Sequence, residues 1–306
     1  MPKQDIIVVG ASAGGVEALQ IFAASLPSDL SAAVFIVLHI GSGGSEKRSY
    51  LPGILTRAGA LTAVHPRDGD PIERGRVYVA PPDCHLLVAA DRVTLSRGPK
   101  ENRTRPAINP LFRSAALAYG DRVTGVILTG MLDDGVAGLA EIKRKGGVAV
   151  IEDPESALYP SMPRRAMARV DVDYVVPLRE VGSIVARLAK TERDAIKRDE
   201  PMQKKATALT CPECRGPISE ERQGKIVEYA CRVGHRYSPL AMKNEHHDTV
   251  ERSLWASVLA LEEAADIAEQ LAPELGLEGI EEASKQREQA ALLKAILAKL
   301  PEDGTE

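Results

Sequence analysis

Cysteine, aromatic residues and long apolar runs are all scarce in this chain of 306 residues. Three of the four cysteines cluster late in the chain at metal-ligand spacing, which fits a reducing compartment better than a disulfide framework. No uninterrupted apolar stretch approaches the roughly 20 residues of a membrane span, and the first residues lack the basic and apolar regions of a signal peptide. The formal net charge of −4 gives no general attraction to nucleic acid. We therefore expect a cytoplasmic protein with no membrane insertion and no nucleic-acid partner.

Aliphatic residues are abundant, and their arrangement predicts the fold class. Hydrophobic residues make up 44% of the chain, so a sizeable core can be buried. From residue 5 to about residue 190, short β-branched runs alternate with helical patterns, which predicts an α/β fold with a doubly wound, mostly parallel, Rossmann-like sheet. The expected strands are Ile6–Val9, Val34–Leu38, Arg76–Ala80, Val123–Leu128, Val148–Ile151 and Asp173–Val176, with a hairpin of Leu86–Ala90 and Arg92–Ser96. The expected helices are Val16–Ser25, Asn109–Ala118, Gly135–Lys145, Pro163–Arg169 and Leu178–Ala189.

A serine stands at the apex of a glycine-rich turn near the N-terminus. Residues 10–15 read Gly-Ala-Ser-Ala-Gly-Gly between an apolar run and a helix-forming run, which predicts a strand, a sharp turn and a helix. Such a turn can expose the Ser12 hydroxyl beside a helix N-terminus, as a nucleophile requires. Two other interpretations stay open. Ser12 could be an ordinary helix N-cap, or the turn could bind a dinucleotide, although Ser12 occupies the position of the second fingerprint glycine.

Two further polar residues follow predicted strands. His39 comes after the apolar run at 34–38, and Asp134 comes after the run at 123–128. In an open α/β sheet, active sites form beyond the carboxyl ends of strands, so Ser12, His39 and Asp134 are expected to lie together. A nucleophilic serine needs a base, and an imidazole base needs a carboxylate to hold its tautomer. Taken singly, the histidine could be structural and the Asp-Gly pair a turn. The chain order Ser, His, Asp differs from that of α/β-hydrolases.

The chain changes in character past residue 190. Residues 191–206 are highly charged and lose periodicity, which predicts a linker. At the far end, residues 246–306 are expected to form a helical hairpin. Its helices are expected at Thr249–Leu271 and from Ile280 to Leu300, on either side of a turn at Pro273–Gly279. The hairpin could be an intramolecular pair or could bind a partner, and we favour the partner.

Metal-ligand spacing appears between the linker and the hairpin. Cys211 and Cys214 form a Cys-x-x-Cys pair, and Cys231 and His235 form a second pair. Two such pairs complete a closed tetrahedral site for structural Zn²⁺ with no position open for catalysis, so residues 207–245 are expected to form a zinc-ribbon-like segment. A redox dithiol and unrelated cysteines are the alternatives.

Four motifs together resemble those of the chemotaxis protein-glutamate methylesterases, the CheB family. They are Gly-Ala-Ser-x-Gly-Gly at 10–15, Tyr-Val-Ala-Pro-Pro-Asp-Cys-His-Leu at 78–86, Leu-Thr-Gly-Met-x-x-Asp-Gly at 128–135 and Met-Pro-Arg at 162–164. The motifs fall in the family's order across about residues 4–190. Residues 1–190 are therefore expected to form a methylesterase catalytic domain.

The resemblance implies an activity and the residues that perform it. Family members hydrolyse glutamyl methyl esters on chemoreceptors and release methanol, and some also deamidate receptor glutamines. The implied triad is Ser12, His39 and Asp134, acting through an acyl-enzyme without a cofactor. The backbone N–H groups of Met131 and Ala13 are implied to hold the oxyanion.

The resemblance also distinguishes between neighbouring candidates. Asp134 directly precedes Gly135, as the family's aspartate does, so Asp133 is expected to face solvent or cap a helix. His85 is similar to a family residue beside the site, and a loop-ordering role is expected for it.

The expected partner is a methylated chemoreceptor, bound through an acidic helical segment. A cluster of basic residues, Arg97, Lys100, Arg103 and Arg105, could steer this segment or form a solvated loop. Well-known family members carry a phospho-accepting receiver domain ahead of the esterase, whereas this chain begins almost at the expected catalytic strand. Activity could therefore be constitutive, controlled by a separate response regulator or other signalling protein, or governed by the C-terminal segment. The alternative function is a non-catalytic scaffold that acts through the zinc and helical region.

The cysteine spacing generates a first prediction. Purified protein is expected to hold one Zn²⁺ per chain, because all four ligands of a closed site are present. Metal analysis of the full chain measures this ratio. A content far below one zinc per chain contradicts the assignment.

Overall fold

The computed structural model describes residues 5–39, 49–191, 201–275 and 277–300. The chain divides into two compact units, Met1–Ala241 and Met242–Glu306. The first unit contains a central sheet and a smaller antiparallel sheet, and the second contains paired helices.

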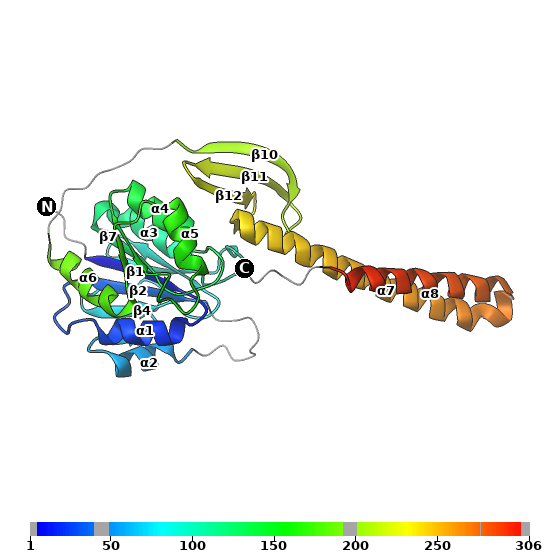
Figure 1. Cartoon of the computed structure of the whole chain (residues 1–306), viewed down its shortest axis with the longest axis horizontal. Coiled ribbons are helices and arrows are strands. Elements are labelled where there is room, and N and C mark those ends of the chain that lie inside the picture. The colour runs from blue at the N-terminus through cyan, green and yellow to red at the C-terminus, as the bar shows by residue number, and fades with distance from the viewer. Residues whose placement is uncertain (1–4, 40–48, 192–200, 276, 301–306) are drawn as a thin grey trace. The chain divides into compact units, whose positions relative to one another are not determined.

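The central sheet has seven strands in the order β3-β4-β2-β1-β7-β8-β9, and every neighbouring pair is parallel (Figure 1). The strands are β1 (Ile6–Ala11), β2 (Ala33–Leu38), β3 (Thr62–Val64), β4 (Arg76–Val79), β7 (Val123–Ile127), β8 (Val148–Glu152) and β9 (Tyr174–Val176). Four of them, β1, β2, β7 and β8, are buried along their whole length, as strands covered on both faces are. The predicted α/β class with a doubly wound parallel sheet is confirmed.

Helices cover both faces of this sheet (Figure 1). The helices of the first face are α1 (Gly15–Ala24), α2 (Leu51–Ala58) and α6 (Leu178–Lys190), and those of the second are α3 (Ile108–Tyr119), α4 (Val136–Arg144) and α5 (Ser161–Arg169). The hairpin of β5 (His85–Ala89) and β6 (Arg92–Ser96) also packs on the second face, and a 3-10 turn at Gly120–Arg122 precedes β7. Ile7 and Val9 belong to the first core and Ile6 and Val8 to the second, because successive side chains of a strand point to opposite faces.

Two elements between β2 and β4 were not expected from the sequence. Helix α2 carries Pro52 and Gly53 in its first turn, where a missing N–H costs no helical bond. Strand β3 has only three residues and lies at the edge of the sheet. Neither element is long enough to show a clear period.

The segment after the described end of α6 forms a four-stranded antiparallel sheet. Its strands are β10 (Gln203–Thr210), β11 (Pro217–Gln223), β12 (Ile226–Cys231) and β13 (Arg236–Tyr237). Strand β10 starts inside the stretch 191–206 that was expected to be a linker, so that expectation is wrong for residues 203–206. The strand is almost fully exposed, so its charged sequence carries no alternation of buried and exposed residues.

The second unit is an antiparallel helix pair. Helix α7 (Pro239–Leu275) begins ten residues before the expected Thr249, and α8 (Leu277–Leu297) follows it. Pro273 lies inside α7, in its last turn, and not in the expected turn between the helices. Small residues meet between the helices, and ion pairs such as Arg287–Glu269 join them.

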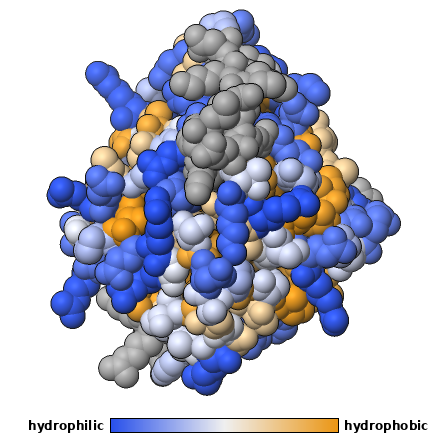
Figure 2. Space-filling model, turned by 90° about the vertical axis from the view of Figure 1, so that its left-hand side faces the viewer, coloured by the Kyte–Doolittle hydropathy of each residue, from blue (hydrophilic) through white to orange (hydrophobic). Residues whose placement is uncertain are grey.

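The surface agrees with the composition of the chain. On the face drawn in Figure 2, hydrophilic side chains predominate and hydrophobic ones lie in separate patches. No helix in the described ranges combines the length and apolar character that crossing a membrane requires.

Close helix packing generates a second prediction. A Cβ at Gly182 in α6 would lie 1.9 Å from Oγ and 2.8 Å from Cβ of Ser25, so Gly182→Ala is expected to lower the free energy of unfolding by about 1–3 kcal/mol. Gly53→Ala in α2 is the matched control, because its nearest neighbour would be 3.5 Å away. The control is expected to be neutral or to stabilise by up to about 1 kcal/mol. Denaturant unfolding measures both changes, and equal stability of the two variants contradicts the packing argument.

Candidate active site

Three loops meet at the carboxyl ends of adjacent strands. Ser12 follows β1, His39 follows β2, and Asp134 lies in the loop between β7 and α4. Strand β1 lies between β2 and β7. From β1 the chain runs through α1 to β2 on one side, while β7 and the strands after it lie on the other side. At such a reversal of strand order, α/β proteins typically hold their ligands beyond the carboxyl ends of the strands.

The side chains of these loops form a continuous chain of hydrogen bonds. Nδ1 of His39 lies 3.2 Å from Oγ of Ser12, and Nε2 of His39 lies 2.8 Å from Oδ2 of Asp134. Because Nε2 faces a carboxylate, the imidazole proton is assigned to that nitrogen. The lone pair on Nδ1 then accepts the proton of the Ser12 hydroxyl. This arrangement is able to activate a serine nucleophile.

Asp134 is only 2% exposed, yet both its oxygens have donors. Oδ2 accepts from His39 and from the Ile108 N–H at 2.6 Å. Oδ1 accepts from Nδ2 of Asn102 at 3.1 Å and from the Asn109 N–H at 3.3 Å. Burial by itself raises the pKa of Asp134, but these donors and the nearby imidazole together hold it below its ordinary value. The carboxylate therefore stays ionised beside His39.

Ser12 is not the cap of the following helix. Helix α1 has Gly14 at its N-cap, with a φ of 70°, and no side chain caps it. A left-handed φ suits glycine, so the strained position of the turn is Gly14 and the Ser12 hydroxyl remains available to His39. The interpretation of Ser12 as an ordinary helix N-cap is thus wrong.

Gly130 lets the loop after β7 run against Ser12. A Cβ at Gly130 would lie 2.9 Å from Cβ of Ser12 and 2.6 Å from Cε of Met162. The Gly130 N–H donates to the Tyr159 carbonyl at 2.9 Å, and its carbonyl accepts the Met162 N–H at 3.0 Å. Only glycine fits here, and the backbone that follows it passes close to the serine.

The backbone on both sides of this contact is held in place. The Ser12 N–H donates to the Thr129 carbonyl at 3.0 Å, and the Thr129 hydroxyl donates to the Ala13 carbonyl at 3.2 Å. Within the residues that the structure describes, neither the Ala13 N–H nor the Met131 N–H has a hydrogen-bond partner in the protein. Both are available to an oxyanion, and that role stays a prediction.

Asp133 is buried, although it was expected to face solvent or cap a helix. It is 2% exposed, and its carboxylate accepts bonds from Arg169 at 2.9 Å and from the Ser238 hydroxyl at 2.6 Å. The N-cap of α4 is Gly135, without a side-chain cap. Asp133 therefore neither faces solvent nor caps the helix, because a distant serine and arginine satisfy it inside the protein.

His85 and Arg105 order the loops beside the site. Nε2 of His85 lies 3.0 Å from the Pro99 carbonyl, and its Nδ1 accepts the Ala107 N–H at 3.3 Å. Arg105 donates twice to Asp83, at 2.9 and 2.7 Å, so its charge is already paired. Arg105, one of the basic residues that could steer a partner, therefore joins the loop of Asp83 to its own loop.

Asn102 is the residue that sequence reasoning missed. It is 8% exposed, has a left-handed φ of 47°, and donates directly to Asp134. Asparagine tolerates this backbone conformation better than most residues. No local pattern marks the position, since its partners lie elsewhere in the chain.

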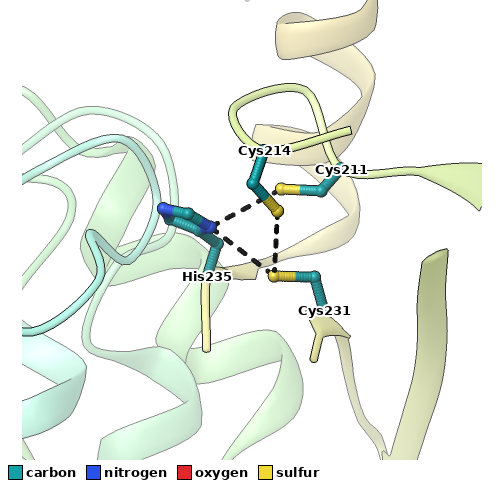
Figure 3. A group of neighbouring side chains, drawn as sticks. All are labelled: Cys211, Cys214, Cys231 and His235. Atoms are coloured by element: carbon teal, nitrogen blue, oxygen red, sulfur yellow. Dashed lines mark hydrogen bonds between the residues drawn. The ribbon is translucent and has the colours of Figure 1, made fainter. Parts of the chain in front are cut away.

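The predicted metal ligands lie together in the antiparallel sheet region (Figure 3). The ligand atoms of Cys211, Cys214, Cys231 and His235 all lie within 4.8 Å of one another. Sγ of Cys214 is 3.7 Å from Sγ of Cys231, and Nδ1 of His235 is 3.5 Å from the latter. Tetrahedral zinc with Zn–S bonds of about 2.3 Å has ligand separations of roughly 3.8 Å, so the spacing fits. Nε2 of His235 lies 3.2 Å from Glu213, which orients the ring.

The chain is similar to known proteins over its first two thirds. A family model described as CheB methylesterase matches residues 7–185. A Leptospira interrogans protein with the provisional name protein-glutamate methylesterase/protein-glutamine glutaminase is 39% identical over 187 residues, which are 60% of this chain and 94% of that protein. A Methanosarcina mazei protein named protein-glutamate methylesterase/protein-glutamine glutaminase 2 is 36% identical over 61% of this chain and 52% of its own length.

A solved structure is similar as well. The crystal structure of the Thermotoga maritima CheB methylesterase catalytic domain aligns with a TM-score of 0.57 at 32% identity. The alignment covers 61% of this chain and 99% of that domain. The similarity therefore extends to nearly the whole of a catalytic domain of this kind.

The contact at Gly130 generates a third prediction. Gly130→Ala is expected to slow the reaction of Ser12 with a fluorophosphonate by about 100-fold, because a displacement near 1 Å in a reacting group can cost that much. Labelling rates of the purified variant, with thermal unfolding to verify its fold, measure the effect. Gly53→Ala serves as the control and is expected to react at the wild-type rate. A folded Gly130→Ala protein that also reacts at the wild-type rate contradicts the tight fit.

Proposed function

The chain belongs to the CheB methylesterase family, and we propose that it hydrolyses glutamyl methyl esters on chemoreceptor-type proteins and releases methanol. The observation that carries the residue assignment is the chain of contacts from Ser12 through His39 to Asp134, at 3.2 and 2.8 Å. Its members come from three different strand ends, so their alignment supports a reactive site more than a set of unrelated turns.

The first half of the reaction forms an acyl-enzyme. His39 Nδ1 takes the hydroxyl proton of Ser12 while Oγ attacks the glutamyl carbonyl carbon. The carbonyl oxygen becomes an oxyanion, which the N–H groups of Ala13 and Met131 stabilise. The carbon–oxygen bond to the methoxy group then breaks, and His39 gives its proton to the departing methanol. Asp134 stabilises the imidazolium throughout.

The second half restores the enzyme. His39 takes a proton from water, and the hydroxide attacks the acyl carbon. The bond to Ser12 breaks, Oγ regains a proton from His39, and glutamate is released. The same steps act on a glutamine side chain with ammonia as the leaving group, so receptor deamidation belongs to the proposal. No step requires a cofactor.

A structural Zn²⁺ is proposed in the cluster of Cys211, Cys214, Cys231 and His235. Burial by itself raises the pKa of Cys231, but hydrogen bonds from His235 and from backbone N–H groups lower it to about 6, which favours the thiolate that binds metal. Four protein ligands close the coordination sphere and leave no place for substrate. The zinc would hold its segment folded, and a clustered thiol site suits a reducing, cytoplasmic location.

The chain is proposed to contain several domains and to act on a protein partner. The domains proposed are a catalytic domain at 1–190, a linker that ends before β10, a zinc-ribbon-like segment that begins with β10 and runs to residue 245, and a helical hairpin at 246–306. The acidic helical segment of a methylated chemoreceptor is the proposed substrate, and a response regulator or another signalling protein is the proposed source of control. A scaffold role remains the second candidate, favoured by the separate helical unit.

Loss of the nucleophile generates a fourth prediction. Ser12→Ala is expected to lower methanol release from methylated chemoreceptor membranes by about three orders of magnitude or more, because no acyl-enzyme can form. Methanol is measured beside the wild-type chain and beside Ser253→Ala, which removes an exposed hydroxyl on α7.

Three outcomes separate the candidate functions. Release by the wild type and by Ser253→Ala, lost in Ser12→Ala, establishes the esterase. Equal release by all three proteins contradicts the role of Ser12. Absence of release from every protein favours the scaffold.

A further inference from the structure

Residues 203–238, which we call the Cys–His segment, contact a loop of the catalytic part. Glu101 pairs with Arg236 of β13 in a parallel bridge, and the Asn102 N–H donates to the Arg236 carbonyl at 2.9 Å. On the same side, a Cβ at Gly234 would lie 3.2 Å from Cγ of Pro99. The loop of residues 99–104 therefore lies along β13 and is bonded to it through the backbone.

A network of charged side chains crosses the same contact. Arg113 of α3 donates to Glu101 and, at 3.4 Å, to Glu228 of β12. Arg236 donates to Glu228 at 2.9 Å and to Glu221 at 2.6 Å. These side chains are between 11% and 24% exposed. Removing one partner from such a network leaves a largely buried charge without a counter-charge, which is costly. These ion pairs therefore favour this one packing of the segment on the loop.

Asn102 connects this contact to the triad. Its Nδ2 donates to Oδ1 of Asp134 at 3.1 Å, while its Oδ1 accepts the Ser238 N–H at 2.8 Å. One end of the amide must donate and the other must accept, which an asparagine does and an aspartate does not. The amide therefore bridges the triad carboxylate and the first residue after β13.

Ser238 makes a second connection beside the first. Its hydroxyl donates to Asp133 at 2.6 Å, one residue before Asp134. The preceding residue, Tyr237, is 1% exposed and places its hydroxyl 3.5 Å from Sγ of Cys211. His235 lies two residues further back in the metal cluster. Four consecutive residues thus reach from the metal ligands to both aspartates.

We propose that Asn102 is a positioning residue for Asp134, and that the Cys–His segment, folded around its metal, holds Asn102 in place. This inference rests on the proposed esterase function of Ser12, His39 and Asp134. Without the segment, Asn102 loses the Ser238 N–H and the Arg236 carbonyl as partners. Oδ1 of Asp134 then keeps only the weaker bond from the Asn109 N–H, at 3.3 Å. Folding of the Cys–His segment thereby controls the position of Asp134 in the triad.

Asn102→Ala tests the positioning role. Methanol release is expected to fall about tenfold to a hundredfold in kcat with KM unchanged, since a hydrogen bond to a charged group is removed and substrate is not contacted. Labelling of Ser12 by a fluorophosphonate is expected to slow by a similar factor. Asn244→Ala, on α7, is the matched control and is expected to behave as wild type. Wild-type rates in Asn102→Ala overturn the proposal.

Asn102→Asp separates positioning from a merely structural role. Aspartate keeps an acceptor for the Ser238 N–H and the same backbone contacts, so a loop anchor would survive the change. It cannot donate to Asp134, and its charge repels that carboxylate. A rate as low as that of Asn102→Ala supports the proposal, and a rate near that of the wild type overturns it.

Loss of metal tests the second half of the inference. Cys214→Ser in the full chain is expected to increase amide hydrogen exchange at residues 101–104 and 133–138 and to slow Ser12 labelling at least as much as Asn102→Ala does. Lys225→Ala, an exposed residue in the β11–β12 turn, is the control. Unchanged exchange in a metal-free Cys214→Ser protein overturns the link. Should the wild type show neither methanol release nor Ser12 labelling, the proposed function fails, and the exchange measurement still decides whether the segment orders these loops.

Discussion

The buried carboxylate of Asp134 is the constraint on which the rest of the site depends. Removing an ionised group from water is costly unless donors surround it, and here four donors from three parts of the chain do so. They are the His39 ring, the Asn102 amide and the N–H groups at the start of α3. Satisfying one charge therefore brings together the end of β2, the loop of residues 99–104 and a helix N-terminus. The imidazole orientation that faces Ser12 follows from this arrangement.

Close backbone packing supplies the second requirement. The serine turn and the loop after β7 approach each other so tightly that Gly130 has no room for a side chain beside Ser12. The strands below are covered on both faces by aliphatic cores, so their ends cannot move apart easily. The backbone around Ser12 is thereby held in place before any substrate binds, as the proposed oxyanion role of the Ala13 and Met131 N–H groups requires.

Much of this architecture could be predicted from sequence, and the failures have physical reasons. Most strands and helices of the parallel sheet have strong periodicity, and their expected positions differ from the structure by only one or two residues. Helix α2 and strand β3 are too short to show a period, and β10 is exposed on an edge. Asp133 was misjudged because an Asp-Asp-Gly sequence is typical of a turn, whereas its partners Arg169 and Ser238 are remote in the chain.

The sequence by itself determined the fold class, the Ser-His-Asp candidates at strand ends and the cysteine–histidine candidates for metal ligands, because each of these depends on local spacing or residue type. Only the tertiary structure decided how buried polar groups are satisfied. The Asn102 amide donates to Asp134 and accepts from the N–H of Ser238, which lies 136 positions after Asn102 in the chain. Such a pairing leaves no period or motif, since any residue with a matching donor or acceptor could fill it. The contacts of Ser238 with Asn102 and Asp133, beside Asp134, therefore become visible only when the chain is folded.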